Sequence, residues 1–175
     1  MQAFDSLSRD IQQYIYDKGW PSLTNIQSAA IKQVANTDHN LILSAPTASG
    51  KTEAAFIPAL NSVEDWETVL KVLHVSPLKA LINDQFQRIS ELSEYLDIPI
   101  TRWHGEVSQT QKRKVVNQPK GILLITPESI EGMLVNRPGE AEHLFKGVEW
   151  IIIDELHSFL GTERGIHLQS LLQRI

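Results

Sequence analysis

The sequence predicts an α/β fold in which a parallel sheet is covered by helices on both faces. Short runs rich in isoleucine, leucine and valine alternate with stretches of helical periodicity along the 175 residues. The apolar runs are continuous, which is typical of strands that are buried on both faces. A composition of 42% apolar and 21% charged residues is ordinary for a globular protein, and the length predicts one domain.

The first elements are expected to be two helices, a strand and a third helix. Phe4, Leu7, Ile11 and Ile15 fall on one helical face, so one helix should end near Gly19, and a second should begin at Thr24. Residues 41–44 (LILS) have the character of a buried strand. A loop and a helix from about residue 51 follow.

The rest of the chain repeats this alternation. A long amphipathic helix is predicted from Leu78 to Leu96, and further strands are predicted at residues 71–75, 98–103, 121–126 and 150–154. Sheets of this class bind ligands at the carboxyl ends of their strands. The motifs described below all follow a strand or begin a helix.

Charge and composition exclude several classes of protein. The absence of cysteine excludes disulfides and thiolate metal sites, and no apolar run reaches the length of a membrane span. We expect a cytoplasmic protein with no membrane partner. The net charge of −5 gives no global basic field, so nucleic-acid binding would need a local patch. The only tight basic run, residues 112–114, is either a solvated helix face or part of such a patch.

Residues 45–52, APTASGKT, predict a phosphate-binding loop between a strand and a helix. Backbone N–H groups of Thr47, Ala48, Ser49 and Gly50 would surround the phosphates of a nucleotide, with the helix N-terminus behind them. Lys51 would reach the β- and γ-phosphates, and the Thr52 hydroxyl would bind Mg²⁺. Ala45 stands where the usual pattern has its first glycine, and a small residue suffices there if its φ stays negative.

A pair of carboxylates follows the last predicted strand in the segment WIIIDELH. Asp154 at the strand end can hold Mg²⁺, and Glu155 can orient or deprotonate an attacking water. In the alternative interpretation, Asp154 caps the next segment and Glu155 is solvated, but this leaves the co-occurrence with a Gly-Lys-Thr loop unexplained. His157 gains interest only from this context, because a lone histidine is more often structural.

Together, APTASGKT and DELH resemble motifs I and II of superfamily 2 helicases of the DExH form. Residues 19–27 (GWPSLTNIQ) are similar to the adenine-reading segment of that family, 76–81 (SPLKAL) to motif Ia and 126–129 (TPES) to motif Ib. Residues 154–168 resemble the large helicase-related (Lhr) and Ski-type helicases. The resemblance implies a RecA-like domain that binds ATP, Mg²⁺ and a single strand or tailed duplex of DNA or RNA.

The resemblance also implies roles for individual residues. Gln27 would read the adenine edge, Lys51, Asp154 and Glu155 would act on the phosphates and water, and His157 would couple the nucleotide site to other motifs. The nucleic-acid face would comprise Pro77, Lys79, His104, Gly105, Thr126 and Glu128.

Three of these assignments have structural alternatives. Thr24-x-x-Gln27 forms a capping box pattern, which by itself explains Gln27. Thr126 before a proline is a sound helix start, and Lys79 can be a solvated helix residue. Residues 19–27 also depart from the family's adenine-reading segment, because Leu23 stands before Thr24 at a position where the family often has proline.

Several motifs of the family are not found in these residues. They are a Ser-Ala-Thr motif on a strand between those that bear motifs I and II, and a second RecA-like domain with an arginine finger. We therefore expect residues 1–175 to be the first RecA-like domain and the N-terminal part of a longer helicase or translocase. A nucleic-acid-triggered ATPase switch or remodeller, a nucleotide-binding scaffold and a small-molecule kinase remain alternatives.

Overall fold

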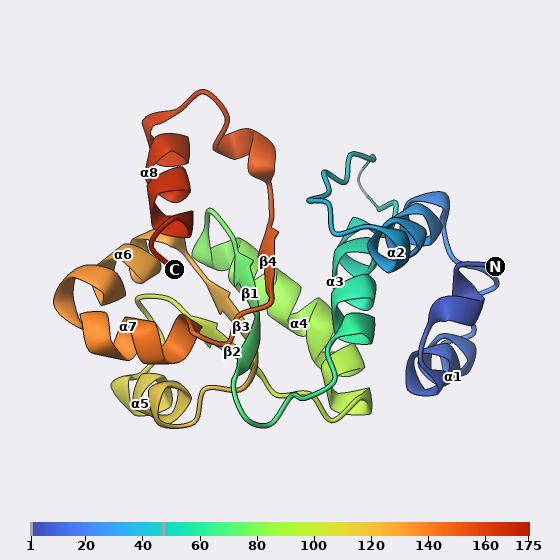
Figure 1. The fold of residues 1–175 in the computed structure, drawn as a ribbon, viewed down its shortest axis with the longest axis horizontal. Coiled ribbons are helices and arrows are strands. Elements are labelled where there is room, and N and C mark those ends of the chain that lie inside the picture. Colours follow the sequence, from blue (N-terminus) through green and yellow to red (C-terminus); the bar gives the residue numbers. More distant parts are fainter. Residues whose placement is uncertain (1, 47) are drawn as a thin grey trace. The chain divides into compact units, whose positions relative to one another are not determined.

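The computed structural model describes residues 2–46 and 48–175 and divides the chain into two compact units, Met1–Glu64 and Asp65–Ile175 (Figure 1). The first unit is helical. It contains η1 (Phe4–Ser6), α1 (Arg9–Asp17), α2 (Asn25–Asn36) and α3 (Lys51–Ser62).

The helix predicted from Phe4 to Gly19 is divided in two. Ser8 has an extended ψ of 154°, and its hydroxyl accepts a hydrogen bond from Ile11 N at 3.4 Å, so it is the N-cap at which α1 begins. The helix ends before Gly19, whose φ of 66° is left-handed. The predicted starts of the next two helices are confirmed, since Thr24 caps α2 and α3 begins at Lys51.

The strand predicted at residues 41–44 is not present. These residues have no regular secondary structure, and Ile42 is 81% exposed. An extended segment becomes a strand only when a neighbouring strand pairs with its N–H and C=O groups. Among the residues that the structure describes, no strand pairs with this segment.

The second unit contains a four-stranded parallel sheet. Its strands are β1 (Leu70–Val75), β2 (Ile100–Trp103), β3 (Gly121–Ile125) and β4 (Trp150–Ile153), in the order β2-β3-β1-β4. The connecting elements are α4 (Lys79–Tyr95), α5 (Gln109–Asn117), α6 (Pro127–Asn136), α7 (Pro138–Phe145), η2 (Leu156–Ser158) and α8 (Glu163–Leu172). The other four predicted strands and the long helix after β1 are thus confirmed, with boundaries shifted by one or two residues.

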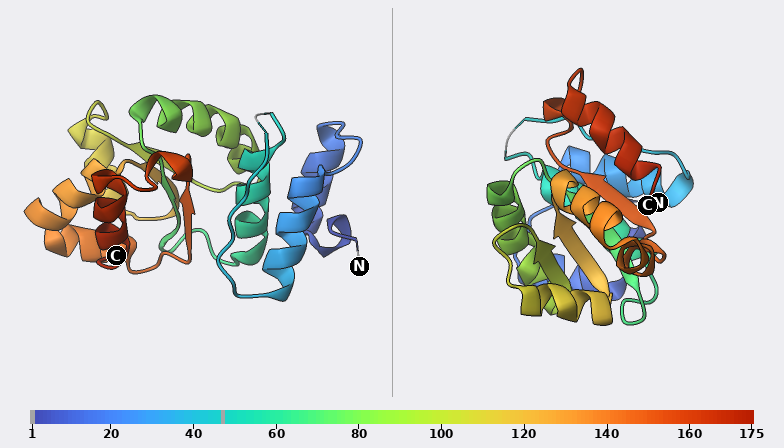
Figure 2. Two further views of the ribbon diagram at one scale, coloured as in Figure 1. Left: turned by 90° about the horizontal axis from the view of Figure 1, so that it is seen from above. Right: turned by 90° about the vertical axis from the view of Figure 1, so that its left-hand side faces the viewer.

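Helices lie on both sides of this sheet, as the continuous apolar strands predict. Side chains of α6, α7 and α8 form one core with Leu73, Val75, Leu123 and Ile125 of the two central strands. Helix α4 contacts β2 and β3 and lies on the other side of the sheet (Figure 2). The expected α/β class is therefore observed. In the described parts of the chain, no helix is long and apolar enough to cross a membrane.

Candidate functional site

The predicted phosphate-binding loop contains a turn that favours glycine at position 50, directly before α3. Gly50 is the N-cap of α3 with φ 83° and ψ 29°, a left-handed conformation that costs other residues about 1–2 kcal/mol. Ala48 also has a positive φ, of 58°, whereas Ala45 is not among the described residues with positive φ. The condition under which alanine can replace the first glycine is therefore met. Thr47 lies outside the described residues.

The Lys51 side chain bends back onto the loop that precedes it. Its ammonium group donates to the carbonyl oxygen of Ala45 at 2.5 Å and to that of Pro46 at 2.8 Å. A lysine ammonium has three donors, so these contacts stabilise the loop around the side chain. The lysine thus already lies over the turn in which a phosphate would bind.

Two hydroxyl side chains flank Gly50 in the sequence. Thr52 lies in the first turn of α3 and is half-buried. The Ser49 hydroxyl is buried, and it has no hydrogen-bond partner among the described residues. Buried polar groups are normally paired, so an unpaired hydroxyl beside the first turn of a helix is suited to a polar ligand.

Gln27 forms the predicted capping box and also contacts the loop. Its side-chain oxygen accepts from Thr24 N at 2.9 Å, and its own backbone N–H donates to the Thr24 hydroxyl at 3.4 Å. The side chain is 4% exposed. A Cβ added to Gly50 would lie 2.5 Å from Gln27 Nε2, so the amide lies directly against the loop. Capping and proximity to the nucleotide loop are therefore compatible.

In the second unit, the candidate residues gather at one edge of the sheet. The strands are parallel, so their carboxyl ends lie at the same edge. Hydrogen bonds continue the ladder past the strands, from Ser76 N to Ile125 O at 3.1 Å and from Asp154 N to Val75 O at 2.9 Å. Segments containing Pro77, His104, Thr126 and Asp154 follow β1, β2, β3 and β4 respectively.

The carboxylate pair lies in a tight turn after β4. Asp154 Oδ1 accepts a hydrogen bond from Glu155 N at 2.9 Å, and Glu155 has left-handed angles of φ 49° and ψ 42°. Such a conformation is sparsely populated for a residue with a side chain and is often found at functional sites. His157 Nδ1 lies 3.2 Å from Glu155 Oε2, and the imidazole is largely exposed. The structure thus brings together Asp154, Glu155 and His157.

The segment after β2 holds a buried histidine with no visible partner. His104 is 5% exposed, and neither ring nitrogen has a hydrogen-bond partner within the described residues. Burial lowers the pKa of His104, and the positive charge of nearby Arg102 lowers it further. Gly105 follows in a turn with open space around its Cα. An imidazole that is unpaired and buried costs stability, which indicates a role other than folding.

Lys79 begins α4 and pairs with Glu106. The hydrogen bond from Lys79 and its positive charge lower the pKa of Glu106. Both side chains are more than half exposed, so this pair adds little stability and leaves the ammonium accessible. The alternative of a solvated Lys79 is partly correct, because the side chain is exposed although paired.

The segment after β3 is the capped helix start that its sequence predicts. Thr126 is the N-cap of α6, and its hydroxyl accepts from Ser129 N at 3.3 Å, with Pro127 in the first turn. Glu128 extends from the same turn and binds Arg164 of α8, which also donates to the carbonyl oxygen of Pro77. Sequence reasoning did not single out Arg164. Its only signal was its place in the segment GTERG after DELH.

The basic run from Lys112 to Lys114 lies on α5. Arg113 and Lys114 are exposed, as expected of a solvated helix face. Lys112 instead lies over the ring of Trp103, with its ammonium 5.7 Å from the ring centroid. Lys112 therefore packs on the strand that leads to His104.

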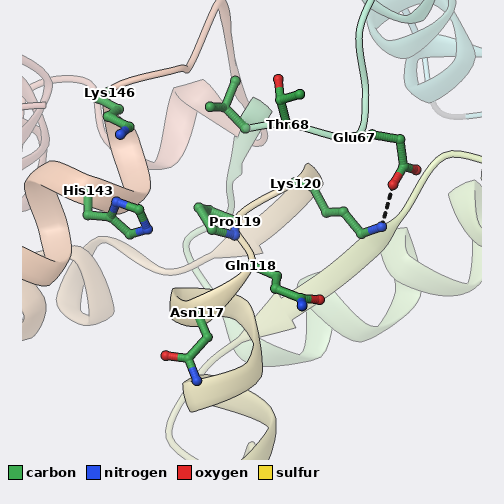
Figure 3. Close-up of a pocket in the computed structure, with 9 residues that line it drawn as sticks. Glu67, Thr68, Asn117, Gln118, Pro119, Lys120, His143 and Lys146 are labelled. Carbon is green, nitrogen blue, oxygen red and sulfur yellow. Dashed lines mark hydrogen bonds and ion pairs between the residues drawn. The ribbon is translucent and has the colours of Figure 1, made fainter.

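A cavity of about 460 Å³ lies at the opposite end of the strands, before Leu70 and Gly121. Figure 3 shows the residues that line it, including the ion pair of Lys120 Nζ with Glu67 Oε2 at 2.6 Å. None of the residues predicted to be functional contributes to it. Its polar, open lining does not resemble the apolar pockets that hold most small ligands.

The donor groups predicted for Mg²⁺ suit that ion. Thr52 offers a hydroxyl and Asp154 a carboxylate, and Mg²⁺ is usually held by one or two protein oxygens together with phosphates and water. Among the described residues, no group of three or more metal-binding side chains is present.

Comparison with known proteins identifies the family. Residues 24–175 match the family DEAD/DEAH box helicase. ATP-dependent helicase Lhr-Core protein 2 of Thermococcus barophilus is 32% identical over 99% of this chain and 22% of its own length. Activating signal cointegrator 1 complex subunit 3 of Dictyostelium discoideum is 31% identical over 87% of this chain and 7% of its own length.

A solved structure shows the same fold. It is that of Mycobacterium smegmatis helicase Lhr bound to ssDNA and AMP-PNP, which is 29% identical with a TM-score of 0.83, over 99% of this chain and 23% of that chain. This chain thus spans less than a quarter of the length of these proteins. The resemblance of its motifs to Lhr-type helicases is confirmed. The chain belongs to the DEAD/DEAH box helicase family.

Proposed function

We propose that this chain is the first RecA-like domain of an ATP-dependent nucleic-acid helicase or translocase. The observation that carries the proposal is the conformation of the loop before α3, where Gly50 is left-handed and Lys51 lies over the turn. This arrangement is suited to nucleotide phosphates. The Lhr structure with ssDNA and AMP-PNP supports the proposal by family likeness.

Each candidate residue has its own role in this proposal. Backbone N–H groups at the start of α3 and the Lys51 ammonium hold the phosphates, and Gln27 contacts adenine. Glu155 orients the attacking water or accepts its proton. His157 Nδ1 lies 3.2 Å from Glu155 Oε2, and through this contact the histidine would couple the nucleotide site to other motifs. Thr52 and Asp154 would hold Mg²⁺, which neutralises phosphate charge when it is bound.

The strand-binding face comprises the segments that follow β1, β2 and β3. Pro77 and Lys79, His104 and Gly105, and Thr126 and Glu128 extend from neighbouring strands of one sheet edge. A face of this kind binds mainly the backbone of a single strand, so we expect weak sequence preference. A second RecA-like domain would close over ATP and supply the arginine that stabilises the transition state.

The decisive experiment measures ATP hydrolysis by the full-length protein that contains this chain. Rates are compared without nucleic acid, with oligo(dT) and with oligo(U), for the unaltered protein, Glu155→Gln and the control Glu94→Gln. Glu94 is an exposed residue of α4 outside the candidate site. We expect strong stimulation by one polymer, its loss in Glu155→Gln, and no change in Glu94→Gln.

Other outcomes would favour the alternatives. A rate of ATP hydrolysis that neither oligo(dT) nor oligo(U) increases would contradict the helicase or translocase proposal. The alternative of a nucleotide-binding scaffold would then remain. Stimulated hydrolysis without strand separation on a tailed duplex would favour a switch or remodeller. The difference between the two polymers would assign the substrate as DNA or RNA.

A further inference from the structure

Arg164 joins three segments that are far apart in the sequence. It is the second residue of α8, and its Nε donates to Glu128 Oε1 at 2.8 Å, with Nη2 2.6 Å from the same oxygen. The same Nη2 donates to the carbonyl oxygen of Pro77 at 2.5 Å. One guanidinium therefore holds the segment after β1 and the segment after β3 together.

The position of Arg164 is itself fixed by the chain that follows DELH. Phe159 is 2% exposed in the core, and the guanidinium of Arg164 lies 5.5 Å from the centroid of its ring. The first turn of α8 approaches this residue so closely that a Cβ on Gly165 would lie 2.0 Å from Phe159 O. Thr162, the N-cap of α8, also donates from its hydroxyl to this oxygen at 2.9 Å. Glycine at position 165 is therefore required for the close contact between α8 and Phe159 that positions the Arg164 side chain.

The charge of Glu128 needs a counterpart if this face binds phosphates. A carboxylate in the first turn of α6 would repel a nucleic-acid phosphate bound at the same helix start. Arg164 supplies the compensating charge, and a guanidinium can bind two acceptors in a fixed geometry. Glu128 is therefore better placed to hold Arg164 than to contact the strand directly.

We propose that Arg164 is a positioning residue for nucleic acid, which sets the relative placement of the Pro77 and Glu128 segments and fixes both to the helix after DELH. The inference rests on the proposed function, because it concerns the same strand-binding face. In this proposal Glu128 acts through Arg164. The two form a unit whose loss separates the segments after β1 and β3.

A second ion pair on the same helices provides a matched control. Arg174 Nη1 lies 2.9 Å from Glu131 Oε2, so it also links the end of the chain after α8 to α6. The two arginine side chains are similarly exposed, at 40% and 35%, whereas Glu131 is less exposed than Glu128, at 31% against 56%. Within the described residues, Arg174 forms no hydrogen bond or ion pair with the segment after β1. A general loss of ion pairing between these helices would affect both arginines alike.

The test uses the full-length protein and measures nucleic-acid-stimulated ATP hydrolysis as a function of oligo(dT) or oligo(U) concentration. For Arg164→Ala, we expect the half-saturating concentration to rise about tenfold. The maximal rate should fall less than threefold. Arg174→Ala should change neither quantity by more than twofold. The melting temperatures of the two variants should be equal, which would show that both are folded to the same extent.

Three further variants keep the test sensitive if Arg164→Ala folds poorly. Arg164→Lys retains the charge but not the two-acceptor geometry, so it should not restore the half-saturating concentration. Glu128→Ala should weaken oligonucleotide binding, although it removes a negative charge. The double variant Arg164→Ala/Glu128→Ala should bind the oligonucleotide no more weakly than either single variant, because the two residues act as one unit.

The possible failures are distinct. If Arg164→Ala and Arg174→Ala behave alike while the unaltered protein is stimulated, the positioning role is wrong and the proposed function stands. Tighter oligonucleotide binding by Glu128→Ala would also contradict the positioning role of Arg164, because Glu128 would then only repel the strand. Absence of stimulation in the unaltered protein would contradict the proposed function itself.

Discussion

His74 predicts an acid sensitivity of the second unit that can be calculated. It lies in the central strand β1, is 1% exposed, and burial lowers its pKa from 6.5 to about 4. The unfolded chain therefore binds a proton between these pH values, whereas the folded chain does not. The stability from neutral His74 is complete above pH 6.5 and is lost as the pH falls towards 4.

The expected magnitude follows from the two pKa values. A difference of about 2.5 pH units corresponds to about 3.4 kcal/mol in full. Between pH 7 and pH 5, the expected loss is about 1.8 kcal/mol, or about a twentyfold increase in the opening constant of the sheet. This loss is large relative to the few kcal/mol by which a domain is usually stable.

Hydrogen exchange in the full-length protein measures this loss at β1 and β3. Exchange at pH 7 and pH 5, corrected for intrinsic rates, is compared for the unaltered protein, His74→Leu and the control His143→Leu, which replaces an exposed histidine of α7. The acid-dependent loss should disappear only in His74→Leu, because leucine does not titrate. An equal loss of protection in all three proteins would refute the reasoning.

Three other substitutions have definite expectations. Gly50→Ala should weaken binding of a fluorescent ATP analogue about tenfold, measured by titration, because the left-handed turn costs alanine about 1–2 kcal/mol. Gly121→Ala should lower the melting temperature strongly, since its Cβ would lie 1.9 Å from Pro99 O at a φ of 71°, whereas Gly132→Ala meets open space and should not. His104→Leu should raise stability by about 1–2 kcal/mol in thermal unfolding, by removing unpaired buried nitrogens, and weaken oligonucleotide binding in anisotropy titrations.

The parallel sheet was predictable because its strands carry their own signal. Residues 121–125 are all buried, and a continuous apolar run of this length predicts such a strand without any partner being known. The helix-capping patterns were also predictable, because each depends only on residues that are close together in the sequence. Thr24 with Gln27, and Thr126 before proline, each predicted a helix start from a few adjacent residues, and both are observed.

Features that depend on partners were not predictable in the same way. Residues 41–44 have the composition of a strand, yet pairing decides whether an apolar run becomes one. Arg164 contacts residues 87 and 36 positions away, at Pro77 and Glu128, and neither contact leaves a local pattern. The contact of Gln27 with Gly50 was hidden for the same reason, because it joins two segments that are separate in the sequence.

The contacts of Lys51 have a consequence for how a nucleotide would bind. Because its ammonium already donates to the carbonyls of Ala45 and Pro46, a phosphate must exchange for these acceptors instead of meeting an unengaged charge. The two carbonyl oxygens thus compete with phosphate for the Lys51 ammonium. The affinity for phosphate depends on the difference in free energy between the two sets of hydrogen bonds. Every anion that engages the Lys51 ammonium gives up the same two hydrogen bonds, so this exchange lowers the affinity of the loop for all of them without selecting among them. The extra binding free energy of a polyphosphate must then come from its other contacts, with the backbone N–H groups of the loop and the start of α3.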